Sequence, residues 1–195
     1  MVRLLSSKLA DFLIRNKIVE ADDKEIYVYG YEILISSLIG IVSVLLLGFL
    51  FNLFLESIIF LVVFILIRQS CGGYHANSYI KCISSFLFIF VLIIFSLNVF
   101  LQYYSYYIWL VLAIICMSVM MYLSPMENTN KPLTKETKNR NRKISIAFSL
   151  IVVILAAILC ELDTKKSLLM MLTLTSICLL MMYEYLKGGA NDEKY

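Results

Sequence analysis

Residues 33–67 have the sequence ILISSLIGIVSVLLLGFLFNLFLESIIFLVVFILI, in which Glu56 is the only charged residue. A helix needs about 20 apolar residues to cross the hydrocarbon core of a bilayer, so this stretch is too long for one span and long enough for two. Asn52 lies near its centre and predicts a tight turn there. We therefore expect a helical hairpin in a membrane, with spans near residues 32–49 and 51–68.

The composition of the whole chain is that of an integral membrane protein. Of its 195 residues, 61% are hydrophobic and the mean hydropathy is +0.86, whereas soluble domains contain roughly 45 to 50% apolar residues. Further apolar runs predict four more spans, near residues 83–101, 106–124, 144–160 and 167–186. The expected fold class is all-α, a polytopic membrane protein with six transmembrane helices in a single domain that covers residues 1–195.

The amino-terminal segment, residues 1–25, predicts an amphipathic interfacial helix. Leu5, Leu9, Phe12 and Leu13 recur at helical spacing with charged residues between them, a pattern typical of helices that lie on a membrane surface. A helix packed against the rest of the protein would show the same pattern, and both arrangements stay open at this point. The mixed charges also argue against a cleavable signal peptide, so we expect the amino terminus to be retained.

Basic residues predict how the spans are oriented. With six spans, all but two of the 17 Lys and Arg side chains fall on one side of the membrane, and only Lys165 and Lys166 fall on the other. Connections rich in Lys and Arg stay in the cytosol. We therefore expect both termini to be cytosolic, together with segment 68–82 and the basic connection 125–143.

Segment 68–82 is a short polar interruption between two apolar runs, and it holds His75, the only histidine of the chain. Histidine is suited to proton transfer near neutral pH, and Cys82 supplies a thiol that such a base activates. In a continuous helix the two side chains would lie about 10.5 Å apart along the axis. Gly72 and Gly73 disfavour a continuous helix, so the loop can fold back and bring His75 to Cys82.

The local sequence also favours a reactive thiol at Cys82. Asn77 or Ser78 is a reasonable N-cap for the following span, which would put Cys82 in the first turns of a helix, where the helix end stabilises a thiolate. Arg68 and Lys81 add positive potential. No third catalytic residue is evident in the loop, although backbone N–H groups at the helix start are candidates for an oxyanion hole.

Two other interpretations stay open on spacing alone. In the first, His75 is an ordinary interfacial residue and Cys82 a packing thiol. In the second, Cys71, His75 and Cys82 are three ligands of a metal ion with an open fourth position. No paired CxxC motif and no second histidine support the metal site, so we expect neither a metal nor another cofactor. The five cysteines are scattered and odd in number, which also disfavours a disulfide framework.

Three features of the chain belong together: the motif R-x4-G-x-H-A-x5-C over residues 68–82, the six predicted spans, and the later segment Pro125–Leu133 with its basic run. In these features the chain resembles the accessory gene regulator B family. Members of this family are membrane cysteine endopeptidases of bacterial peptide quorum sensing. The resemblance covers nearly the whole chain. It implies that Cys82 is the nucleophile and His75 the general base.

The resemblance also implies a substrate, a small precursor peptide of the accessory gene regulator D type (AgrD-like). Such a peptide has an amphipathic amino-terminal helix, a central pheromone segment and an acidic carboxy-terminal tail. Cleavage would release the tail and leave the pheromone part on Cys82 as a thioester, and a substrate thiol or hydroxyl would then close a thiolactone or lactone ring. The implied site faces the cytosol at a bacterial plasma membrane. The implied partners are the peptide and the lipid bilayer, without nucleic acid, and a homodimer is compatible with so small an enzyme.

Six basic residues gather between the fourth and fifth spans: Lys131, Lys135, Lys138, Arg140, Arg142 and Lys143. Their positive field would attract and orient an acidic peptide tail. The same charges also act as a topology signal and attract anionic lipid, at about 1 kcal/mol per residue, so both explanations stay open. The alternative function is a non-enzymatic small-peptide exporter or membrane scaffold, although the predicted spans hold few polar residues that would form a transport path.

Overall fold

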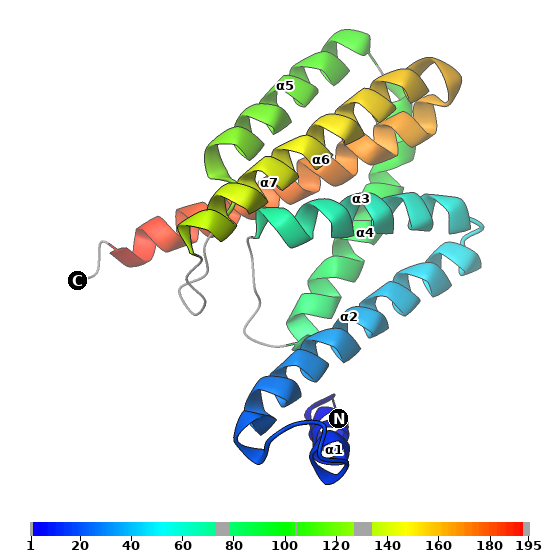
Figure 1. Cartoon of the computed structure of the whole chain (residues 1–195). Helices are drawn as coiled ribbons and strands as arrows, with labels where there is room; N and C mark the ends of the chain where they lie inside the picture. The colour runs from blue at the N-terminus through cyan, green and yellow to red at the C-terminus, as the bar shows by residue number, and fades with distance from the viewer. Residues whose placement is uncertain (1, 73–78, 104, 127–133, 193–195) are drawn as a thin grey trace.

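The structure, a computed structural model, describes residues 2–72, 79–103, 105–126 and 134–192. Within these ranges the chain is helical apart from short connections and one isolated β-bridge (Figure 1). The elements in chain order are α1 (Val2–Arg15), the short 3-10 helix η1 (Ala21–Asp23), α2 (Lys24–Leu50), α3 (Phe54–Cys71), α4 (Tyr79–Gln102), α5 (Tyr106–Leu123), α6 (Lys135–Leu162) and α7 (Thr164–Asp192).

In the described part of the chain, the six helices α2 to α7 are long and apolar enough to cross a membrane, which confirms the predicted spans. The hairpin is also confirmed, because α2 ends at Leu50, α3 begins at Phe54, and Asn52 between them has a φ of 55°. Asparagine adopts this left-handed conformation more readily than most residues do. Asn52 therefore suits the backbone conformation of the turn that it predicted.

The helix of the fifth span is longer than the sequence predicted. It begins at Lys135 rather than near residue 144, so much of the basic connection is helical. The Thr134 side chain caps this helix by accepting a hydrogen bond from the Thr137 backbone N–H at 3.3 Å, and Glu136 in the first turn complements the helix dipole. The basic side chains of α6 therefore project from a helix in defined directions.

Helix α7 is the centre of the bundle, because it contacts α3, α4, α5 and α6. Helices α5, α6 and α7 run side by side (Figure 1). The fully buried side chains of α7 are spread along the helix: Ser167, Leu169, Met171, Thr173, Leu174, Ile177 and Met181. Many large apolar side chains on α2, α4 and α5 are exposed, which suits helices that face lipid tails.

Helix α1 packs against α2 and keeps its larger apolar residues outside. Ser6 and Ala10 are buried in α1, and Asp11 forms a 2.6 Å ion pair with Lys24 at the start of α2. Phe12, by contrast, is 61% exposed. The packing of α1 against the rest of the protein is therefore observed, and its exposed apolar residues leave the membrane-surface arrangement a prediction.

Two contacts show which connections share an end of the bundle. Lys165 and Glu56 form a 2.6 Å ion pair between the starts of α7 and α3, so the α2–α3 and α6–α7 turns lie at one end. The Met126 backbone N–H donates to the Cys71 carbonyl oxygen at 2.9 Å, so the connections after α3 and after α5 meet at the other end. This is the alternation expected of six spans, and it brings the two polar connections that the sequence singled out to the same side.

The contact at this second end, here named the loop clasp, is formed by Arg68, Cys71, Gly72 and Met126. Gly72 ends α3 with φ 68° and ψ −150°, a backbone conformation essentially confined to glycine, and it pairs with Met126 in a β-bridge. A Cβ atom on Gly72 would overlap the Met126 carbonyl oxygen. The Arg68 guanidinium donates to the Gly72 carbonyl oxygen. The helix break predicted at Gly72 is confirmed, and the loop clasp requires glycine there.

The substitution Gly72→Ala should destabilise the protein by about 1 to 3 kcal/mol, because alanine is strained in this conformation and its Cβ displaces Met126. Gly30→Ala is the matched control, since nothing lies within 4 Å of a Cβ at that position and alanine suits a helix better than glycine by about 1 kcal/mol. Thermal unfolding in detergent micelles, followed by circular dichroism, measures the difference. Equal stability of the two variants would contradict the loop clasp.

Candidate functional site

Cys82 lies in the first turn of α4, which begins at Tyr79, and its free thiol is exposed. The backbone N–H groups of a first helical turn have no partner within the helix, and the helix dipole there favours negative charge. Both features suit a nucleophilic sulfur and an oxyanion that forms beside it. The structure thus puts the Cys82 thiol at the helix start that the sequence predicted.

Four of the predicted site residues lie outside the described residues: Gly73, His75, Asn77 and Lys131. The pairing of His75 with Cys82 and the helix cap by Asn77 therefore stay predictions. The structure does describe both ends of the connection that carries them, because α3 ends at Cys71 and α4 begins at Tyr79. This connection starts at the loop clasp and finishes within one turn of Cys82.

Arg68 and Cys71 are both part of the loop clasp. Arg68 is half-buried, and its guanidinium donates a hydrogen bond to the carbonyl oxygen of Gly72, just after the end of α3. Cys71 is fully buried, and its Sγ lies 3.4 Å from the Gly72 carbonyl oxygen. A structural thiol buried in this way is inert. Of the two cysteines in segment 68–82, Cys82 is therefore the one that a peptide can reach.

The basic residues of α6 divide between two faces of the helix. Its buried side chains recur three or four residues apart: Ser145, Ser149, Val152 and Ala156. Lys135, Lys138 and Arg142 extend the same spacing towards the helix start, where all three are exposed. We name them the inward basic stripe because they continue the line of the buried face. Arg142 donates to a backbone carbonyl oxygen at the end of α5 at 2.9 Å. Arg140 and Lys143 lie off this stripe, so the basic residues of α6 project from more than one face of the helix.

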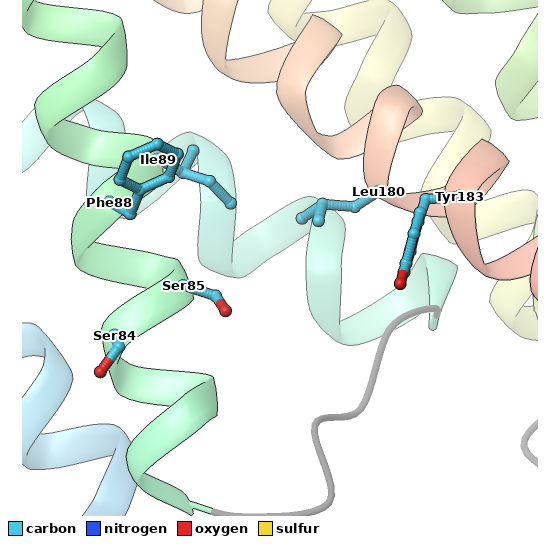
Figure 2. A pocket seen from close by; sticks show the side chains of 6 residues that line it. All are labelled: Ser84, Ser85, Phe88, Ile89, Leu180 and Tyr183. Carbon is cyan, nitrogen blue, oxygen red and sulfur yellow. The ribbon is translucent and has the colours of Figure 1, made fainter.

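An open groove of about 650 Å³ lies between α4 and α7 (Figure 2). It is lined by Ser84, Ser85, Phe88 and Ile89 of α4 and by Leu180 and Tyr183 of α7. In Figure 2, Ser85 and Ile89 extend from α4 towards α7, and Leu180 extends towards α4. The sequence did not predict this groove, because its walls come from helices far apart along the chain.

Two buried carboxylates were not assigned to the site from the sequence. Glu32 is 8% exposed and lies on the stripe of α2 that also buries Val28 and Gly40. At Gly40 this stripe faces α4, because a Cβ there would contact Phe86. The Oε2 atom of Glu184 on α7 is buried and has no hydrogen-bond partner among the described residues. Carboxylates inside apolar helices usually mark functional positions. In the sequence, the four-residue spacing between Val28 and Glu32 was the one sign that Glu32 lies on the same helix face as a buried apolar residue.

All five cysteines have free thiols. In the ranges that the structure covers, no three His, Cys, Asp or Glu side chains gather into a metal site. His75 is outside these ranges, so the interpretation of Cys71, His75 and Cys82 as metal ligands is not tested by this search.

Comparison with known proteins identifies the family. The sequence model described as Accessory gene regulator B matches residues 6–184. AgrB-like protein 2 of Clostridium perfringens strain 13 is 30% identical over 148 residues, which are 73% of this chain and 69% of the relative. An AgrB-like protein of strain SM101 is 30% identical over 150 residues, with the same two shares. No solved structure matches the chain. The chain therefore belongs to the accessory gene regulator B family, and this membership connects it with the agr quorum-sensing system.

Proposed function

We propose that this protein is a membrane cysteine endopeptidase that removes the acidic tail of an AgrD-like precursor peptide and promotes closure of the pheromone segment into a ring. One observation carries the proposal. In a chain of the accessory gene regulator B family, the exposed Cys82 thiol lies in the first turn of α4, and the only histidine lies on the connection just before it.

In the first step His75 takes the proton of the Cys82 thiol, and the sulfur attacks the carbonyl carbon of the scissile peptide bond. Backbone N–H groups in the first turn of α4 are the candidate donors to the oxyanion. The tetrahedral intermediate then collapses and the C–N bond breaks. The imidazolium returns its proton to the leaving amine, so the acidic tail departs and the pheromone part stays on the sulfur as a thioester.

In the second step a thiol or hydroxyl of the bound peptide gives its proton to His75 and attacks the thioester carbonyl. The C–S bond to Cys82 breaks, a thiolactone or lactone ring forms, and the proton returns to the Cys82 sulfur. Water would hydrolyse the thioester instead, so this route requires a site from which water is excluded. The start of a membrane-spanning helix suits this requirement, because hydrocarbon borders the site on one side.

The charge around this end of the bundle supports an acidic substrate. Lys135 and Lys138 of the inward basic stripe belong to the connection that the loop clasp joins to the end of α3. A positive field here attracts a negatively charged peptide tail towards the end of the bundle that holds Cys82. We assign this end to the cytosol, because all but two of the 17 Lys and Arg residues fall on that side.

Cys82→Ala should abolish release of the acidic tail from an AgrD-like precursor, and His75→Ala should slow it by about 100- to 10,000-fold, the usual contribution of a general base. Cys160→Ala is the matched control and should cleave normally, because this half-buried thiol lies near the opposite end of α6. Mass spectrometry of purified protein incubated with the peptide measures the released tail. Cleavage by the Cys82→Ala variant would refute the proposal, and peptide transport by that variant would favour an exporter.

Replacing both Lys135 and Lys138 with glutamine should raise the KM for the precursor about three- to tenfold, as expected for the loss of two exposed charge interactions. The increase should shrink at high salt, because exposed charges are screened. The control is Arg140→Gln with Lys143→Gln, which removes the same charge off the inward basic stripe and should change KM less. Equal effects of the two double variants would show that only total charge matters.

A further inference from the structure

The α4–α7 groove is open to its surroundings and large enough to hold part of a peptide. Phe88 and Ile89 of α4 and Leu180 of α7 supply its apolar walls, and its volume is about 650 Å³. That volume accommodates a few amino-acid side chains rather than a whole precursor. The groove is therefore suited to a short stretch of substrate that includes a large apolar residue.

The groove begins about one helical turn beyond the candidate nucleophile on α4. Cys82, Ser85 and Ile89 are spaced at i, i+3 and i+7, so they lie on one face of α4. Along the helix axis Cys82 is about 4.5 Å from Ser85 and about 10.5 Å from Ile89, at 1.5 Å per residue. Since Ser85 and Ile89 line the groove, the thiol lies about one turn from the nearest lining residues, towards the start of α4. A peptide whose carbonyl is at Cys82 would have its neighbouring residues in the groove.

Hydroxyl groups distinguish this groove from a surface shaped only for lipid tails. Ser85 and Tyr183 each bring a hydroxyl to its lining, whereas the Ser84 side chain points away from α7 (Figure 2). Ser85 donates to the Lys81 carbonyl oxygen at 2.8 Å, which leaves its oxygen able to accept a hydrogen bond. An extended peptide brings backbone N–H and C=O groups that need partners in an apolar setting, whereas an acyl chain brings none. The lining therefore favours a peptide over a lipid chain.

Positive charge lies at the same end of the groove as the thiol. Lys81 directly precedes Cys82 on α4, and Lys187 lies one turn beyond Tyr183 on α7, and both are exposed. Acidic residues are attracted to this end and are disfavoured deeper between the apolar walls. This gradient gives a bound peptide a direction, with apolar residues in the groove and acidic residues outside it.

We propose that the α4–α7 groove is the acyl-side specificity site, which binds a large apolar side chain of the precursor immediately before the scissile bond. The inference rests on the proposed role of Cys82 as the nucleophile. Phe88, Ile89 and Leu180 contact the side chain, while Ser85 and Tyr183 bond to the peptide backbone. The residues after the scissile bond, which include the acidic tail, then extend towards Lys81 and Lys187.

Peptidyl chloromethyl ketones test this site without any peptide-bond cleavage, because the Cys82 sulfur displaces chloride and forms a stable thioether. The probes are acetyl-Leu-Phe-chloromethyl ketone, acetyl-Gly-Gly-chloromethyl ketone and iodoacetamide, and mass spectrometry of the fragment that contains Cys82 gives each rate. The wild-type protein in phosphatidylcholine nanodiscs should react about tenfold or more faster with the phenylalanine reagent than with the glycine reagent, as expected of an apolar specificity pocket. Iodoacetamide reports the reactivity of the thiol itself.

Leu180→Trp fills the groove and should abolish the preference for phenylalanine while leaving the iodoacetamide rate within about twofold. Leu180→Ala removes an apolar contact without adding bulk and should weaken the preference. This second variant keeps the test informative if the tryptophan variant misfolds. Leu179→Trp is the matched control, because Leu179 is 60% exposed and does not line the groove, and it should keep the preference.

An unchanged preference in both Leu180 variants would overturn the groove as a peptide site, as would equal wild-type rates with the two ketones. A phospholipid that is retained by the wild-type protein and lost from Leu180→Trp, with no difference between the ketones, would identify a lipid site instead. The two proposals fail separately. A preference for the phenylalanine reagent without cleavage of the precursor would support the groove as a peptide site and reject the peptidase function. Cleavage of the precursor without that preference would reject only the specificity role of the groove.

Discussion

The contact between the end of α3 and Met126 is the constraint on which the rest of the candidate site depends. Gly72 takes a conformation that other residues avoid, and the backbone of Met126 approaches it too closely for a Cβ. Arg68 secures the same turn from within α3. Because of this contact, the connection that leads to Cys82 and the connection that leads into the basic start of α6 leave from one point. The chemistry and the charge that we assign to the site thus share one end of the bundle.

The bundle holds this arrangement with little help from the hydrophobic effect, since lipid tails are as apolar as the side chains that face them. Close packing around α7 and a few polar contacts take its place. Buried Ser145 and Ser149 allow α6 to pack closely within the bundle, and the Glu56–Lys165 ion pair joins α3 to α7 at the far end. The amino-terminal part of α4 is less enclosed by other helices, and the groove lined by Ser85 and Leu180 lies beside it (Figure 2).

The sequence predicted the features that depend on local composition. Spans follow from the length of apolar runs, the turn at Asn52 from a residue that tolerates a positive φ, and the break after Cys71 from Gly72. It missed the features that depend on which helices become neighbours. Nothing near Ser85 indicates that Leu180 will lie opposite, and the helical start of α6 at Lys135 depends on the cap by Thr134. The burial of Glu32 was missed for the same reason, since it depends on the helices that pack against α2.

The formation of a thioester on Cys82 is the central chemical claim, and intact-protein mass spectrometry measures it directly. The purified protein is incubated with an AgrD-like precursor whose ring-closing thiol or hydroxyl has been removed by substitution with alanine, so that the second step is blocked. We expect the protein to gain the mass of the peptide without its acidic tail, with the addition located on Cys82 and removed by hydroxylamine. Release of the tail with no such addition, or with the addition on another residue, would contradict the mechanism.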